Sequence, residues 1–196
     1  MKRVLSIQDI SCIGKCSLTV ALPIISAMGI ETSILPTSIL STHTMFNDFT
    51  FRDLTDDMEP IKKHWQKEGF SFDAIYTGYL GSEKQITLVK DYFKTFGNTC
   101  KYIIVDPAMA DNGKLYSGFD KDFPLKMAKL CKYADVILPN ISEAAFMTGM
   151  PYPGENASNE CIKDLLLSLA KLGSKKIVIT GVESADHKFG FMGYDS

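Results

Sequence analysis

The 196-residue sequence lacks several patterns that mark whole classes of protein. It has no excess charge of one sign: 21 Lys and Arg against 23 Asp and Glu give a net charge of −2, which argues against a nucleic-acid surface or a basic membrane surface. No apolar run approaches the length of a membrane span. The apolar run near the N-terminus is too short for a signal peptide. The five cysteines are scattered without a Cys-x-x-Cys pair, which favours free thiols in a reducing compartment. We therefore expect a cytoplasmic protein with no nucleic-acid or membrane partner.

Two further absences narrow the kinds of binding site. No Gly-x-Gly-x-x-Gly follows the first expected strand, which disfavours a dinucleotide-binding fold. Residues 13–17, Ile-Gly-Lys-Cys-Ser, resemble the end of a phosphate-binding loop, but the upstream glycine is missing and Cys16 stands where Ser or Thr is required. The three histidines have no metal-like spacing, although His43 lies in a polar segment where it could contact a ligand.

What the sequence does contain is a regular alternation of short apolar strands and amphipathic helices. We expect parallel strands at 4–7, 32–35, 73–77, 102–105, 136–138 and 176–180, helices at 18–28, 55–67, 82–97, 124–132, 141–148 and 162–172, and a weak strand at 188–192. Pro36 and Gly181 are expected to end their strands, and residues 37–48 and 108–121 to form a flap and a long mobile loop. The pattern predicts one α/β domain over residues 1–196, a three-layer αβα arrangement with a central, mostly parallel sheet.

Polar or glycine-rich sequence follows each expected strand, and the carboxyl ends of parallel strands meet at one sheet edge, where ligands bind. The main candidates at this edge are Asp9, Thr37, Tyr79, Asp106, Asp111, Asn140, Glu143, Thr180 and Gly181. The carboxylates and the amide suit Mg²⁺ bound through water and nucleotide phosphates, which favours phosphoryl transfer. Thr180 and Gly181 offer a hydroxyl and a close backbone approach to phosphate.

Two helix starts also admit a structural interpretation. Asn140 could simply cap the helix at 141–148, with Glu143 complementing the same helix N-terminus. Ser82 and Gln85 form a capping-box pattern, in which each side chain satisfies a free backbone N–H at the start of the helix. The residues alone leave both interpretations of Asn140 and Glu143 open.

The order and spacing of these segments resemble those of the ribokinase-like superfamily and, within it, of the pyridoxal/pyridoxamine (vitamin B6) kinases. Five segments carry the resemblance: Ser6–Asp9 with Gly14, Leu35–Thr44, Gly78–Ser82 (Gly-Tyr-Leu-Gly-Ser), Asp106–Asp111 (Asp-Pro-Ala-Met-Ala-Asp) and Pro139–Glu143. It implies that Asp9, Thr37, His43 and Tyr79 contact the vitamer, and that Asp111, Tyr116, Asn140, Glu143, Thr180 and Gly181 contact the nucleotide, with Asp111 and Glu143 on the metal. The implied cofactors are ATP and Mg²⁺, with K⁺ as a further candidate, and the implied assembly is a homodimer.

The chain departs from the family's pattern at three places. Asp9 stands where many pyridoxal kinases have Ser, and Ala110 replaces the usual Gly. The Gly-x-Gly-Asp segment, whose Asp activates the substrate hydroxyl, is absent, so we expect a chain truncated at its C-terminus, with the base beyond Ser196 and little activity. Two alternatives stay open: a hydroxymethylpyrimidine (phosphate) kinase of the same superfamily, with which Asp9 is consistent, and a non-catalytic, truncated binding domain.

Overall fold

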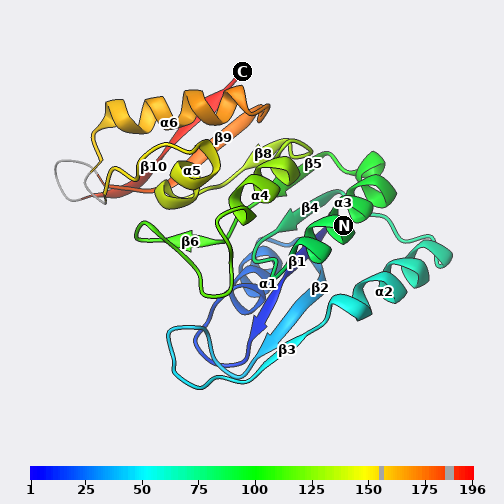
Figure 1. The fold of residues 1–196 in the computed structure, drawn as a ribbon. Helices are drawn as coiled ribbons and strands as arrows, with labels where there is room; N and C mark the ends of the chain where they lie inside the picture. The colour runs from blue at the N-terminus through cyan, green and yellow to red at the C-terminus, as the bar shows by residue number, and fades with distance from the viewer. Residues whose placement is uncertain (155–156, 184–187) are drawn as a thin grey trace. The chain divides into compact units, whose positions relative to one another are not determined.

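The computed structural model describes residues 1–154, 157–183 and 188–196. The chain forms two compact units, residues 1–103 and residues 104–196, with the boundary inside strand β5. Within each unit, mostly parallel strands lie side by side, and helices pack against them (Figure 1). Among the described residues, no helix is long and apolar enough to cross a membrane.

Unit 1 contains a sheet in which the neighbouring strands follow the order β4, β1, β2, β3. The elements are β1 (Arg3–Ser11), α1 (Leu18–Ala27), β2 (Glu31–Leu40), β3 (Phe51–Asp53), α2 (Thr55–Lys67), β4 (Ala74–Thr77), α3 (Glu83–Phe96) and the 3₁₀ turn η1 (Gly97–Thr99). β1 pairs in parallel with β2 and β4, whereas the short edge strand β3 runs antiparallel to β2. Because the chain moves from β1 to β2 and then back past β1 to β4, right-handed crossovers place α1 and α2 on opposite faces.

The core of unit 1 follows from the apolar faces of these elements. Leu5 and Ile7 of the central strand β1 are fully buried. An aromatic cluster joins α2 to α3, where Trp65 packs edge-on against Tyr92 and Phe96 at ring-centroid distances of 6.2 and 6.5 Å. Because these residues of β1 are packed in the core, the polar residues at the C-terminal end of the strand are held in place.

In unit 2 the neighbouring strands follow the order β5, β8, β9, β10. Its elements are β5 (Tyr102–Val105), β6 (Ala110–Asp111), β7 (Lys114–Leu115), α4 (Phe123–Cys131), β8 (Val136–Ile137), α5 (Ile141–Thr148), α6 (Asn159–Lys171), β9 (Lys176–Glu183) and β10 (Phe189–Asp195). β10 is antiparallel to β9, whereas β8 pairs in parallel with both β5 and β9. α6 packs on β9 and β10 and contacts α5, which in turn contacts α4.

The sequence prediction ended several strands too early: β1 and β10 continue to Ser11 and Asp195, and the ends placed at Pro36 and Gly181 were also wrong. β2 does not stop at Pro36 but continues to Leu40, because its pairing with β1 shifts register just after the proline, where the missing N–H is tolerated. β9 does not stop at Gly181 but continues to Glu183. Gly181 has φ +68° and lies where the pairing with β10 skips a residue, which is the geometry of a glycine bulge.

The expected loop at 108–121 contains a β-hairpin. β6 and β7 pair through Ala110 with Leu115 and Asp111 with Lys114, and the two residues between them, Asn112 and Gly113, have φ +49° and +70°. Positive φ at both central positions is the pattern of a type I′ hairpin turn, which the Asn-Gly sequence favours.

Candidate functional site

Asp9 lies near the C-terminal end of β1 and is almost fully buried, with 5% of its surface exposed. The Ser11 hydroxyl donates to its Oδ2 at 3.3 Å, while its buried Oδ1 has no hydrogen-bond partner among the described residues. Burial raises the pKa of this carboxyl above its usual value. A buried acceptor oxygen without a donor can accept a hydrogen bond from a bound ligand.

Thr37 and Tyr79, predicted from separate segments, are bonded to each other. The Thr37 hydroxyl, fully buried in β2, donates to the Tyr79 carbonyl at 3.2 Å. Burial raises the pKa of the Tyr79 hydroxyl, and the negative charges of Asp9 and Asp53 raise it further. The structure therefore brings Asp9, Thr37 and Tyr79 together within unit 1.

His43 takes a different place, on the loop that follows β2. Its backbone N–H donates to the Ile13 carbonyl at 3.1 Å, which ties this loop to the one between β1 and α1. Its imidazole packs directly on Gly14, where an added Cβ would lie 1.9 Å from the ring. Gly14 is therefore needed for the approach of His43, and the ligand role of His43 stays a prediction.

Asn140 and Glu143 form a complete capping box at the start of α5. The Asn140 side chain accepts from the Glu143 N–H at 2.9 Å, and Glu143 Oε2 accepts from the Asn140 N–H at 2.8 Å. Glu143 Oε1 also accepts from the Met109 N–H at 3.2 Å. Burial and the nearby charge of Asp106 raise the pKa of Glu143 well above its usual value. Asn140 and Glu143 therefore do cap the helix, as the structural interpretation predicts, and this role does not prevent them from also contacting a ligand.

The first turn of α5 also holds the β6–β7 hairpin. The Asn140 amide donates to the Ala110 carbonyl at 2.8 Å, and the Ser142 hydroxyl accepts from the Gly113 N–H at 2.8 Å. The Tyr152 ring lies against Gly113 so closely that a Cβ there would be 2.5 Å from it. Asp111, which the hairpin carries, is thus held at a fixed place beside α5.

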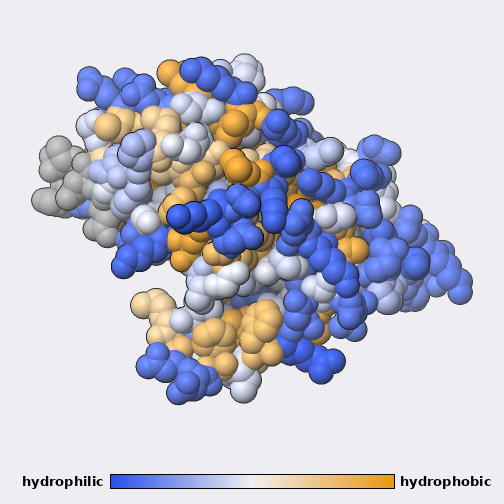
Figure 2. Space-filling view, in the orientation of Figure 1, coloured by the Kyte–Doolittle hydropathy of each residue, from blue (hydrophilic) through white to orange (hydrophobic). Residues whose placement is uncertain are grey.

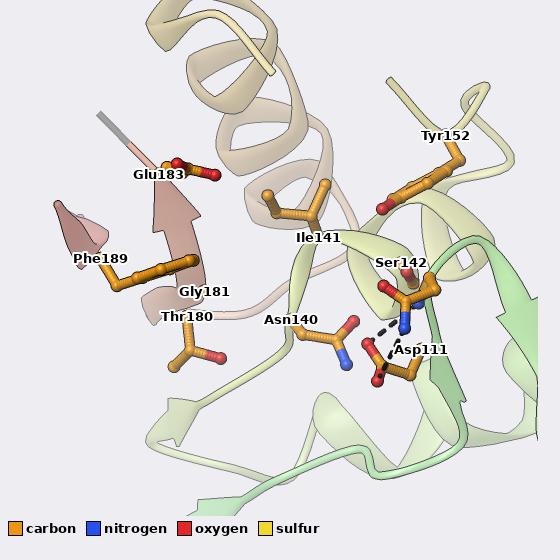
Figure 3. Close-up of a pocket in the computed structure, with 10 residues that line it drawn as sticks. Asp111, Asn140, Ile141, Ser142, Tyr152, Thr180, Gly181, Glu183 and Phe189 are labelled. Carbon is orange, nitrogen blue, oxygen red and sulfur yellow. Dashed lines mark hydrogen bonds between the residues drawn. The ribbon is translucent and has the colours of Figure 1, made fainter. Parts of the chain in front are cut away.

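These elements of unit 2 surround a cavity of about 240 Å³ (Figure 3). Its lining residues are Asp111, Asn112, Asn140, Ile141, Ser142, Tyr152, Thr180, Gly181, Glu183 and Phe189. Figure 3 shows the Asn140 amide and the Thr180 hydroxyl pointing into the cavity from neighbouring backbone segments, which are joined by the Thr180 N–H to Pro139 carbonyl bond of 2.9 Å.

Four predicted nucleotide residues, Asp111, Asn140, Thr180 and Gly181, line this cavity, whereas Glu143 is buried and is not among the lining residues. The predicted lid residue Tyr116 is not among the lining residues, although its N–H bonds the Met109 carbonyl at 2.9 Å. Sequence reasoning missed the six others in the lining. The Asn-Gly hairpin signal could have placed Asn112, whereas nothing local pointed to Tyr152, Glu183 or Phe189.

The carboxylates of unit 2 can be tested for their fit to Mg²⁺. Among the described residues, no group of three or more His, Cys, Asp and Glu side chains is arranged to hold a metal ion. Asp111 is exposed beside the cavity, and the mutual repulsion of Asp106 and Glu143 would be relieved by a nearby cation. This donor set fits an ion that keeps several waters and is shared with phosphates, as Mg²⁺ prefers, and does not fit a closed protein cage.

Comparison with known proteins gives a family match over most of the chain. A sequence model described as phosphomethylpyrimidine kinase matches residues 31–191. A pyridoxal kinase from Actinobacillus pleuropneumoniae is 27% identical over 188 residues, which are 91% of this chain and 63% of that protein. The chain therefore spans somewhat less than two thirds of the length of this curated relative.

Two solved structures are similar along the whole chain. A protein from Bacteroides thetaiotaomicron, provisionally assigned as a phosphomethylpyrimidine kinase and solved with pyridoxal, matches with a TM-score of 0.92 and 41% identity over 99% of this chain and 68% of its own. The pyridoxal kinase from Lactobacillus plantarum matches with a TM-score of 0.86 and 33% identity over 100% of this chain and 73% of its own. These matches confirm the predicted α/β fold of the ribokinase-like type.

Proposed function

This chain belongs to the phosphomethylpyrimidine kinase family, and from that premise we propose that it transfers a phosphoryl group from ATP to the 5′-hydroxymethyl group of pyridoxal, pyridoxine or pyridoxamine. The observation that carries the choice of substrate is the 41% identity to the Bacteroides protein that was solved with pyridoxal. The Lactobacillus pyridoxal kinase supports the same choice at 33% identity.

The vitamer is assigned to unit 1. Asp9 offers a buried acceptor oxygen to an N–H or O–H group of a heteroaromatic ring. Tyr79 offers aromatic area for stacking, and its backbone carbonyl is held by the hydrogen bond from Thr37. His43, at the flap, would cover the ring. These groups select a flat molecule that carries polar substituents at its edge.

The nucleotide is assigned to the cavity of unit 2. Asn140 and Thr180 would donate to phosphate oxygens, and the bulge at Gly181 lets the ligand approach the backbone without a side chain in the way. Asp111 and Glu143 would hold Mg²⁺ through water, and the ion would neutralise charge on the phosphates. Tyr116, on the segment after the hairpin, would close over the bound nucleotide.

In this mechanism the chain's own residues act by binding and orientation, which dominate phosphoryl transfer. Asp9 and Tyr79 fix the ring, so that its hydroxymethyl group has a single direction. Asn140 and Thr180 fix the phosphates, and Asn140 is itself held by Ala110 and by the capping box. We assign no proton acceptor for the substrate hydroxyl to the described residues.

A second candidate is phosphorylation of hydroxymethylpyrimidine or its phosphate. It is favoured by the description of the matched family and by Asp9, because a buried carboxylate suits the amino group of a pyrimidine. A third possibility is a domain that binds a nucleotide without catalysing transfer. Each of the three makes a different prediction for binding.

We further propose that the protein is a cytoplasmic homodimer. β3, the loop before it and the adjoining β1–α1 loop expose apolar side chains: Ile13, Met45, Phe46 and Phe51 are 64, 88, 50 and 48% exposed. Figure 2 shows hydrophobic residues gathered in the lower part of the view, over the loops near β3. An exposed edge strand beside apolar residues is a surface that a second copy can cover.

Isothermal titration of the chain with pyridoxal, with hydroxymethylpyrimidine and with a non-hydrolysable ATP analogue plus Mg²⁺ tests these assignments. We expect the ATP analogue and pyridoxal to bind, and hydroxymethylpyrimidine to bind at least tenfold more weakly than pyridoxal. Tighter hydroxymethylpyrimidine binding would overturn the vitamer assignment in favour of the second candidate. Binding of the nucleotide alone would favour the third. Chromatographic detection of phosphorylated product then reports transfer.

A further inference from the structure

Gln85 is a fully buried polar residue in the first turn of α3, and its amide is bonded at both ends. The predicted capping box forms only in part. The Ser82 hydroxyl accepts from the Gln85 N–H at 3.3 Å, as expected, but Gln85 Oε1 accepts from the Gly81 N–H at 2.8 Å. The amide group therefore holds the segment that contains Tyr79, two residues before Gly81.

The other end of the same amide reaches β2 and the start of α2. Gln85 Nε2 donates to the Thr37 carbonyl at 3.0 Å and to the Thr55 hydroxyl at 2.9 Å, with Asp53 Oδ1 at 3.3 Å. Thr37 is 48 residues away along the chain. Gln85 is thus a cross-link between the two segments that carry Thr37 and Tyr79.

Formation of α3 itself does not require these bonds. Ser82 already caps the helix, and Ile86, Val89 and Phe93 supply its buried apolar face. A buried amide is costly unless all its hydrogen bonds are made, and a methionine of similar size would fill the same space without that requirement. We therefore attribute the presence of an amide at position 85 to the two segments that it joins, those that carry Thr37 and Tyr79.

We propose that Gln85 is a positioning residue for the vitamer site, which fixes the separation between Thr37 and the Tyr79 ring. The proposal rests on the assignment of the vitamer to unit 1. Thr37 is held at its carbonyl by Gln85 and bonds the Tyr79 carbonyl through its hydroxyl, so loss of the amide frees both segments together. Gln85 acts on the ligand only through these two residues.

The test compares Gln85→Met, Gln85→Glu and a matched control, Gln66→Met, which changes an exposed glutamine of α2. Gln85→Glu keeps the acceptor for Gly81 but turns a carboxylate oxygen toward the Thr37 carbonyl and Asp53. We expect both Gln85 variants to raise the dissociation constant for pyridoxal about tenfold or more. The constant for the ATP analogue should change less than twofold, and the control should match the wild type.

Amide hydrogen exchange on the same variants gives a readout that needs no ligand. We expect faster exchange in residues 37–40 and 78–81 of Gln85→Met, with exchange in the middle of α3 unchanged. Unchanged exchange in both segments would overturn the proposal, as would equal losses of pyridoxal and nucleotide binding, which indicate a general structural role. If the wild type binds no pyridoxal but the exchange result holds, the substrate assignment fails while the cross-link stands.

Discussion

The Glu143→Ala substitution removes a carboxylate that is 2% exposed and accepts one backbone N–H at each oxygen, from Met109 at 3.2 Å and from Asn140 at 2.8 Å. A buried donor that loses its acceptor costs about 1–3 kcal/mol, so two such donors cost about 2–6 kcal/mol. Removing the charge also relieves its repulsion with Asp106, which offsets part of this loss. We expect the free energy of unfolding to fall by about 3 kcal/mol.

The assay is urea denaturation followed by far-ultraviolet circular dichroism, with thermal melts in parallel. For a protein of this size about 1 kcal/mol corresponds to about 2–4 °C, so the midpoint should fall by about 6–12 °C. Glu143→Gln keeps one acceptor oxygen and should lose about half as much. Glu160→Ala is the matched control, because Glu160 is an exposed acid in the first turn of α6, and it should cost less than about 1 kcal/mol.

Two results would refute this reasoning. If Glu143→Ala costs no more than Glu160→Ala, the buried bonds to the backbone contribute nothing beyond the helix dipole. If Glu143→Gln is as damaging as Glu143→Ala, the number of acceptor oxygens does not set the cost, and the negative charge itself must be stabilising.

Three further predictions concern single residues. Because burial raises the pKa of Asp9 above 3.8 in the folded protein, the wild type should lose stability as pH rises through the folded value. Asp9→Asn should therefore match the wild type below pH 3.8 and exceed it at neutral pH in denaturant titrations. Gly113→Ala should destabilise by at least about 1 kcal/mol more than Gly118→Ala, since both glycines have positive φ but only Gly113 lies against Tyr152. Equal costs would show that the ring moves aside freely. In pyridoxal titrations, Tyr79→Phe should keep most of the affinity that Tyr79→Ala loses, because the ring supplies the stacking area.

The elements that the sequence predicted well are those whose signals are local. α2 and β5 have the predicted bounds of 55–67 and 102–105, and α5 ends at Gly149, which has the left-handed conformation expected of a terminating glycine. The two strand ends placed at Pro36 and Gly181 were wrong for a shared reason. Each residue interrupts the local pattern, but pairing with a neighbouring strand absorbs the interruption in a bulge, and that pairing cannot be seen in the strand's own sequence.

The site residues also divide into those that a local sequence pattern predicts and those that depend on contacts between distant segments. The segments ending in Asp9, Tyr79, Asn140 and Thr180 were found because polar residues after apolar strands are a local pattern. Tyr152 was not found, because its contact with Gly113 depends on how a loop after α5 returns to the hairpin. The ligand roles of all the predicted site residues stay predictions.

The capping box at α5 also governs how this part of the chain opens to solvent. Met109 and Gly113 donate their N–H groups to Glu143 and Ser142, so the hairpin and the first turn of α5 share their hydrogen bonds. Neither can open without exposing the amides of the other, and the two should unfold as one cooperative unit.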